Sequence, residues 1–152
     1  MRHPTPPDRP DEEAVMAVVL NPYLGFAGRA REALEFYHAI FGGDLHLMTW
    51  GEGGLADDPA RVDLIQHGQI SAPDLTLMAA DSGSPEQEQS GSSISVSLSG
   101  DDETRLRAYW DGLAEGATIT EPLTQAPWGD TFGMLTDRFG TAWMVNISPA
   151  RA

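Results

Sequence analysis

The chain contains neither cysteine nor lysine among its 152 residues. The absence of cysteine excludes disulfides, thiolate nucleophiles and zinc or iron–sulfur sites with cysteine ligands. The absence of lysine excludes Schiff-base catalysis and phosphate-binding loops that depend on a lysine ammonium group. Several common catalytic mechanisms are therefore ruled out before any motif is considered.

Long hydrophobic runs are also missing. No stretch reaches the ~18 consecutive apolar residues of a transmembrane helix. Prolines and acidic residues occupy the N-terminal segment, where a signal peptide needs an apolar run. We therefore expect a cytoplasmic protein that has no membrane segment.

Positive charge is scarce as well, because 9 arginines face 23 acidic residues and the formal net charge is −14. A field of this sign repels phosphate backbones and anionic lipid surfaces. We therefore expect neither nucleic acid nor a membrane among the partners. The acidity is typical of a well-solvated surface, and the alternative interpretation is attraction of metal ions or other cations.

The length and the 41% hydrophobic content fit one domain that can bury roughly two thirds of its unfolded surface. Residues 1–14 are rich in proline and acidic residues, which predicts a disordered tail. Residues 15–149 are predicted to form the domain. Within it, the polar stretch 82–92 can bury no core and is predicted to link two modules, 15–81 and 93–149.

In the first module, alternation of apolar residues predicts a strand that ends at Phe26, with Leu20, Pro22 and Leu24 on the same face. Helical spacing then predicts a helix over 29–41, which ends before a glycine pair. Its apolar stripe consists of Ala30, Ala33, Leu34, Tyr37 and Phe41. Three further strands are predicted at 45–50, 61–70 and 74–81.

The second module repeats this order. A strictly alternating strand at 93–99 precedes a helix at 102–115, and three strand candidates follow at 118–130, 131–137 and 141–148. The same sequence of elements occurs twice, so we predict an α+β fold made of two βαβββ modules.

Three sequence blocks resemble PhnB-like proteins, a branch of the vicinal oxygen chelate (glyoxalase/bleomycin resistance/extradiol dioxygenase) superfamily. They are LNPYLGFAGRAREALEFYHAIFGGDL at 20–45, HGQISAPDLTLMAADS at 67–82 and WGDTFGMLTDRFGTAWMVNIS at 128–148. The resemblance implies a curved mixed sheet around a cavity, and usually a homodimer.

The resemblance also implies where a metal would bind, because metal-dependent members take three or four ligands from the first and last strands of each module. Strand parity places Tyr23, Met78, Ser95 and Met144 at these positions. Phenol, thioether and hydroxyl groups are weak ligands for the divalent ions concerned, which prefer imidazole and carboxylate. We therefore predict no bound metal and no cofactor.

His67 is the histidine that we expect to have a role, since parity groups it with Asp63, Ile65 and Gln69 on a face that we expect to line the cavity. The alternatives are a hydrogen-bonded structural histidine, a general base or ligand anchor, and a metal ligand. Asp81, Asp130 and Asp137 occur in predicted turns, where hydrogen bonding within the turn competes with acid–base catalysis.

Three of the four tryptophans divide into two groups. Trp143 alternates with apolar residues and is predicted to lie in the core, whereas Trp50 and Trp128 adjoin glycine-rich turns, where a pocket mouth or a dimer contact is expected. The side chains expected to contact a ligand are Tyr23, Trp50, His67, Met78, Trp128, Met144 and Asn146.

Three functions remain open. The first is a homodimer that binds a small hydrophobic or aromatic molecule without a metal. The second is an enzyme with His67 as the base and Asn146 or a backbone group stabilising an oxyanion. Relatives are often labelled ubiquinone-pathway methyltransferases, but the FAGRARE segment leads directly into a helix and offers no glycine-rich loop for S-adenosylmethionine. The third is an interaction protein that uses its acidic surface, for which the sequence locates no patch.

Overall fold

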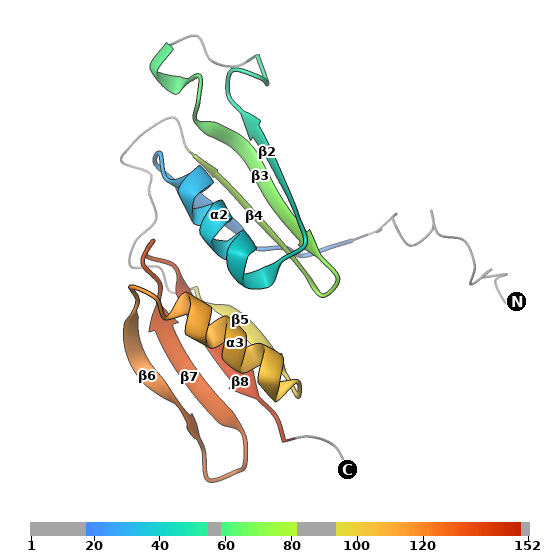
Figure 1. Cartoon of the computed structure of the whole chain (residues 1–152), viewed down its shortest axis with the longest axis vertical. Helices are drawn as coiled ribbons and strands as arrows, with labels where there is room; N and C mark the ends of the chain where they lie inside the picture. The colour runs from blue at the N-terminus through green and yellow to red at the C-terminus, as the bar shows by residue number, and fades with distance from the viewer. Residues whose placement is uncertain (1–17, 55–58, 82–93, 150–152) are drawn as a thin grey trace, which may run out of the picture.

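The computed structural model describes residues 18–54, 59–81 and 94–149 (Figure 1). The predicted tail 1–14 and linker 82–92 lie outside the described residues. The elements are β1 (Tyr23–Phe26), α2 (Ala30–Phe41), β2 (Asp44–Thr49), η1 (Pro59–Arg61), β3 (Ile65–Ala72), β4 (Leu75–Asp81), β5 (Val96–Gly100), α3 (Glu103–Leu113), β6 (Thr118–Gln125), β7 (Thr131–Thr136) and β8 (Ala142–Ile147). None of the helices in these segments is long and apolar enough to cross a membrane.

The strands form two mixed sheets of four strands, in the orders β1-β4-β3-β2 and β5-β8-β7-β6. In each sheet the first strand pairs in parallel with the last strand of its module, and the other pairings are antiparallel. Figure 1 shows each helix over its own sheet, with α2 and α3 adjacent near the centre. The predicted pair of βαβββ modules is confirmed.

Helix α2 forms as its spacing predicts, because its apolar side chains recur on one stripe and all become buried. The helix ends at Gly42 and Gly43, which both have positive φ angles that favour glycine. Gly43 also lies so close to β3 that a Cβ atom there would clash with the Ser71 carbonyl. The buried stripe consists of Ala30, Ala33, Leu34, Tyr37 and Phe41.

Two predictions about strand faces are wrong. The first strand begins only at Tyr23, and Leu20 is 98% exposed rather than grouped with buried Leu24. The third strand begins at Ile65, and its pairing with β2 shifts so that Gln66 is an extra residue between the paired positions on either side. Such a bulge reverses the alternation locally.

The bulge explains why Ile65 and His67 do not share a face. Ile65 is fully buried against the core, whereas His67 lies on the other side of the sheet and is only partly buried. Asp63 precedes the strand and is exposed. The predicted grouping of Asp63, Ile65, His67 and Gln69 is therefore reduced to His67 and Gln69.

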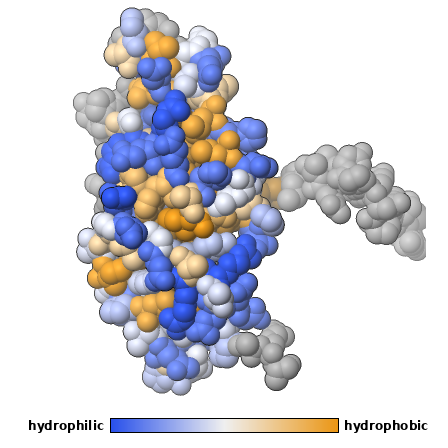
Figure 2. Space-filling model, viewed as in Figure 1, coloured by the Kyte–Doolittle hydropathy of each residue, from blue (hydrophilic) through white to orange (hydrophobic). Residues whose placement is uncertain are grey.

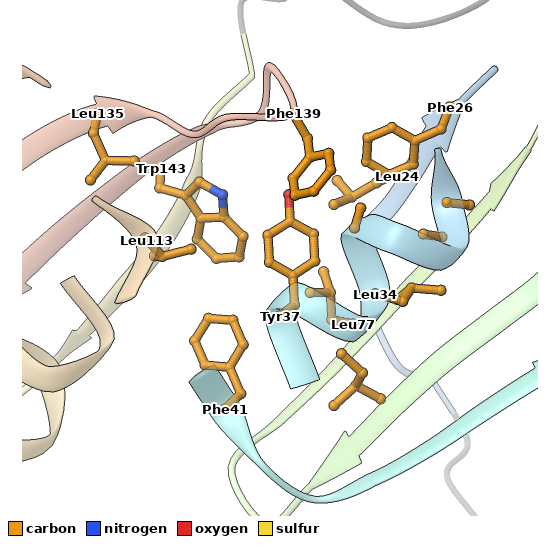
Figure 3. Packing of buried hydrophobic residues seen from close by; sticks show 14 of the residues in the cluster. Leu24, Phe26, Leu34, Tyr37, Phe41, Leu77, Leu113, Leu135, Phe139 and Trp143 are labelled. Carbon is orange, nitrogen blue, oxygen red and sulfur yellow. The ribbon is translucent and has the colours of Figure 1, made fainter. Parts of the chain in front are cut away.

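One aromatic cluster joins the two modules (Figure 3). Tyr37 and Phe41 of α2 lie 5.6 and 5.7 Å, between ring centroids, from Trp143 of β8. Phe139, from the turn between β7 and β8, lies 6.1 Å from Tyr37. Trp143 is 2% exposed, which confirms its predicted place in the core.

The face of the molecule in Figure 2 is hydrophilic over much of its area, and its largest hydrophobic patches lie near the middle. The abundant hydrophilic surface agrees with the excess of acidic residues.

Candidate functional site

Asp81 stabilises the start of α2 and is not available for acid–base chemistry. Its carboxylate is 3% exposed and accepts hydrogen bonds from the backbone N–H groups of Gly28 (2.7 Å), Ala30 (3.0 Å) and Ile65 (3.0 Å). Arg29, at the N-cap position, makes no side-chain cap to the helix, so a residue from β4 satisfies the free N–H groups instead.

Asp137 has an equally structural role at the boundary between the modules. It is 4% exposed and accepts hydrogen bonds from the backbone N–H groups of Phe139 (2.8 Å) and Thr141 (3.0 Å), from Trp143 Nε1 (2.8 Å) and from the Tyr37 hydroxyl (2.5 Å). Burial and the adjacent Asp137 carboxylate raise the pKa of Tyr37 above its ordinary value. For both buried aspartates, Asp81 and Asp137, the structure therefore favours a hydrogen-bonding role over acid–base catalysis.

The side of the first sheet that faces away from α2 carries a chain of polar side chains. We call this side face A; its residues are Tyr23, Asp44, His46, Met48, His67, Gln69, Ser71, Thr76 and Met78.

Four residues of face A form consecutive hydrogen bonds. The Tyr23 hydroxyl lies 2.9 Å from His67 Nδ1, His67 Nε2 lies 3.4 Å from Gln69 Oε1, and Gln69 Nε2 donates to Ser71 Oγ at 3.0 Å. The Tyr23 and His67 rings are tilted, with centroids 5.6 Å apart. The fold thus brings together two predicted ligand contacts that are 44 residues apart.

Methionines border this chain. Met78 is paired with Tyr23 on one side and with Gln69 on the other, and Met48 is paired with His67. Tyr23 is 51% exposed and Met48 is 40% exposed. Face A therefore offers hydrogen-bonding groups within a flexible, polarisable apolar surround.

The equivalent side of the second sheet also carries two methionines. We call it face B; its residues are Ser97, Ser99, Glu121, Thr124, Phe132, Met134, Met144 and Asn146. Met134 is paired with Met144, and Phe132 with Asn146, whose side-chain amide donates to Asp130 at 3.2 Å. Two more predicted contacts, Met144 and Asn146, thus lie on the face that corresponds to face A.

The two remaining predicted contacts lie elsewhere. Trp50 follows β2, and its indole N–H donates to the backbone carbonyl of Asp81 at 3.3 Å, which ties it to the end of β4. Trp128 lies in the turn between β6 and β7 and is 74% exposed. Neither belongs to the hydrogen-bond chain that contains Tyr23 and His67.

A cleft of about 750 Å³ lies between the modules, and sequence analysis did not predict it. Its walls come from β4, β5 and α3, and none of the predicted ligand contacts lines it. Arg105 of α3 spans the boundary to Asp74 of the β3–β4 turn in a 2.5 Å ion pair, and this hydrogen bond raises the pKa of Arg105. That His67 lines a ligand cavity stays a prediction, since face A is an open sheet face in the single chain.

The donor atoms at the ends of the module strands do not fit a divalent metal. Tyr23, Met78 and Met144 offer phenol and thioether groups, and Ser95 offers a hydroxyl. Within residues 18–54, 59–81 and 94–149, no three histidine or acidic side chains are grouped as a metal site would need. We therefore derive no chemical step that passes through a metal.

Comparison with known proteins gives consistent results. The profile of the 3-demethylubiquinone-9 3-methyltransferase family matches residues 19–146. The crystal structure of protein PA1353 from Pseudomonas aeruginosa is 35% identical, with a TM-score of 0.75 over 88% of this chain and 100% of that one. Protein YjdN of Escherichia coli (strain K12) is 26% identical over 139 residues, which cover 84% of this chain and 94% of that protein.

Two more distant structures share the fold. A putative 3-demethylubiquinone-9 3-methyltransferase, PhnB protein, from Bacillus cereus is 22% identical, with a TM-score of 0.68 over 85% of this chain and 98% of that one. A glyoxalase/bleomycin resistance protein/dioxygenase family enzyme from Burkholderia phytofirmans PsJN is 14% identical, with a TM-score of 0.54 over 82% and 95%.

Proposed function

This chain belongs to the 3-demethylubiquinone-9 3-methyltransferase family, the PhnB-like branch of the glyoxalase/bleomycin resistance superfamily, and we propose that it binds a small hydrophobic or aromatic molecule without a metal. The observation that carries this proposal is the placement of methionine. All four methionines in the part of the chain that the structure describes, Met48, Met78, Met134 and Met144, lie on face A or face B. Methionine suits surfaces that adapt to apolar ligands.

The site is completed by a second copy of the chain in this proposal. Faces A and B belong to separate sheets, and each is open to solvent in the single chain. β1 and β5 are also unpaired sheet edges, which proteins commonly cover by association. A cytoplasmic homodimer in which face A of one copy meets face B of the other would enclose a cavity lined by methionines and by the polar groups of face A.

Methyl transfer, which the family description names, has little support at the expected cofactor position. An S-adenosylmethionine site after a first strand uses free backbone N–H groups at the start of the following helix. Here the N–H groups of Gly28 and Ala30 are already bound to Asp81. The backbone N–H groups of Gly28 and Ala30 are therefore not free to bind a cofactor.

Catalysis by His67 as a base is the alternative. The 2.9 Å contact with the Tyr23 hydroxyl is the kind of partner that orients a catalytic imidazole. However, both ring nitrogens already have partners within face A. This arrangement favours binding over proton abstraction.

A fluorescence titration with the neutral probe N-phenyl-1-naphthylamine tests the binding function. We expect saturable enhancement with the wild-type protein, and a several-fold weaker affinity for Met78→Gln, because the substitution places an amide at the centre of face A. Val62→Gln is the matched control, since Val62 is also a partly exposed apolar residue but lies off both faces. Equal affinities for the two variants would contradict a site on face A.

Light scattering at micromolar protein concentration tests the dimer separately. We expect a mass of twice the 16.4 kDa chain. A mass of 16.4 kDa across the concentration range would contradict closure of the faces by a second copy.

A further inference from the structure

The hydrogen-bond chain on face A has a direction, and this direction determines which ligand groups Tyr23 can bind. This selectivity depends on the proposed binding function. Gln69 donates from its amide nitrogen to Ser71, so its amide oxygen faces His67. An amide oxygen only accepts, so this contact is a hydrogen bond when His67 Nε2 carries the proton.

A neutral imidazole has one N–H group and one nitrogen lone pair. With the proton on Nε2, the Nδ1 atom of His67 is the acceptor, and the Tyr23 hydroxyl donates to it. The hydroxyl proton of Tyr23 is then committed to His67. What Tyr23 presents to the open side of the sheet is an oxygen with unused lone pairs.

The residue paired directly with Tyr23 supplies no competing donor to this oxygen. Met78 is paired with Tyr23 and carries only a thioether, which is a weak acceptor. The other titratable side chains on the face, His46 and Asp44, come from β2 and are paired with Gln69 and Ser71. Tyr23 is the titratable residue that β1 contributes to face A. Strand β4 contributes none to this face.

We propose that Tyr23, held as a hydrogen-bond acceptor by His67, selects ligands that carry a hydroxyl or N–H donor on an otherwise apolar, aromatic body. Phenols, aryl alcohols and aryl amines belong to this class, and the corresponding ethers do not. His67 acts as a positioning residue, because it sets the polarity of the Tyr23 hydroxyl without needing to touch the ligand.

Two probes of nearly the same shape, 2-naphthol and 2-methoxynaphthalene, test the proposal. They are titrated by intrinsic probe fluorescence at neutral pH. The wild-type protein is expected to bind 2-naphthol about two- to tenfold more tightly, the range expected for one net neutral hydrogen bond. Tyr23→Phe is expected to remove this preference by weakening 2-naphthol binding while leaving 2-methoxynaphthalene binding unchanged.

His67→Leu gives the sharper result, because it releases the Tyr23 hydroxyl. The freed hydroxyl can donate to the ether oxygen, so 2-methoxynaphthalene is expected to bind more tightly to this variant than to the wild type. If His67 had only a structural role, its loss would not strengthen the binding of 2-methoxynaphthalene. His38→Leu, which removes a histidine of α2 that lies off both faces, is the control and should keep the wild-type preference.

The outcomes separate this inference from the proposed function. If both probes bind with equal affinity, or the ether binds more tightly at neutral pH, the inferred direction of the chain is wrong and the binding function stands. If neither probe binds, the binding function fails and the inference fails with it.

Discussion

Each module places an aspartate from a turn against the helix of the other module, and the two contacts differ in burial. Asp137, in the β7–β8 turn, is 4% exposed and accepts a hydrogen bond from Tyr37 of α2. Asp74, in the β3–β4 turn, is paired with Arg105 of α3 at the cleft, where the side chains are 62% and 44% exposed.

This difference shows where the arrangement of the modules is determined. A buried carboxylate surrounded by donors cannot lose them without a large desolvation penalty, whereas an exposed ion pair exchanges its partner for water at little cost. The contact at Asp137 should therefore hold the modules together, and the contact at Asp74 should be dispensable.

Asp137→Ala should have the largest effect. It leaves the Tyr37 hydroxyl, the Trp143 indole N–H and two backbone N–H groups buried without their acceptor. We expect a loss of about 3 to 5 kcal/mol in the free energy of unfolding, measured by urea denaturation. A loss below about 1 kcal/mol, the size of one ordinary hydrogen bond, would show that Asp137 does not hold the boundary.

The aspartates that cap the two helices show the same contrast between a buried and an exposed carboxylate. Asp81 caps α2 from a buried position with three backbone N–H groups, whereas exposed Asp102 accepts only the N–H of Arg105 at the start of α3. Asp81→Ala should cost about 2 to 4 kcal/mol and Asp102→Ala about 1 kcal/mol in the free energy of unfolding. Equal losses in parallel denaturation curves would contradict the importance of burial.

The Tyr37→Phe variant tests the contact between Tyr37 and Asp137 through the pH dependence of stability. The raised pKa of Tyr37 means that the unfolded chain loses the hydroxyl proton at a lower pH than the folded chain. The stability from this group is complete below about pH 10, the ordinary tyrosine value, and falls as pH rises further. The wild type should lose stability between about pH 10 and 11.5 more steeply than Tyr37→Phe.

The Phe variant should also be less stable than the wild type at neutral pH by about 1 to 2 kcal/mol, because Asp137 loses one donor. Tyr109→Phe is a useful control for the alkaline experiment, since Tyr109 belongs to α3 and its hydroxyl accepts from Arg105 at an exposed position. Parallel alkaline curves for the wild type and Tyr37→Phe would be incompatible with the buried contact.

Arg105→Ala should have the smallest effect on stability. It removes the ion pair with Asp74 and the contact with Tyr109, both at the surface. We expect a thermal midpoint indistinguishable from that of the wild type at physiological salt concentration, because exposed ion pairs are screened. A clear drop in the midpoint would show that the boundary depends on both contacts.

Local patterns predicted much of this fold. The apolar stripe of α2 and the alternation around Trp143 identified buried positions correctly, because helix and strand geometry repeat over a few residues. The same reasoning failed at Ile65, where the bulge opposite β2 changes the alternation. A bulge depends on how two strands pair, and a single strand carries no clear sign of it.

The candidate site shows the same division. Parity identified Tyr23, His67 and Met78 as side chains of one face, but not the hydrogen bonds that give this face its direction. The partner of Asp137 was equally hidden, since Tyr37 lies 100 residues earlier in the chain. The intermodule cleft exists only because the two modules meet.

The sequence by itself determined the order of elements, the repeated βαβββ module, the family and the absence of thiol and lysine chemistry. These properties follow from residue composition and from periodicities shorter than one element. Only the tertiary structure decided which donors surround Asp81 and Asp137, where the bulge falls, and which atom of His67 faces Tyr23. Those features depend on contacts between distant segments, because a buried polar group takes whichever partner the packing brings within hydrogen-bonding distance.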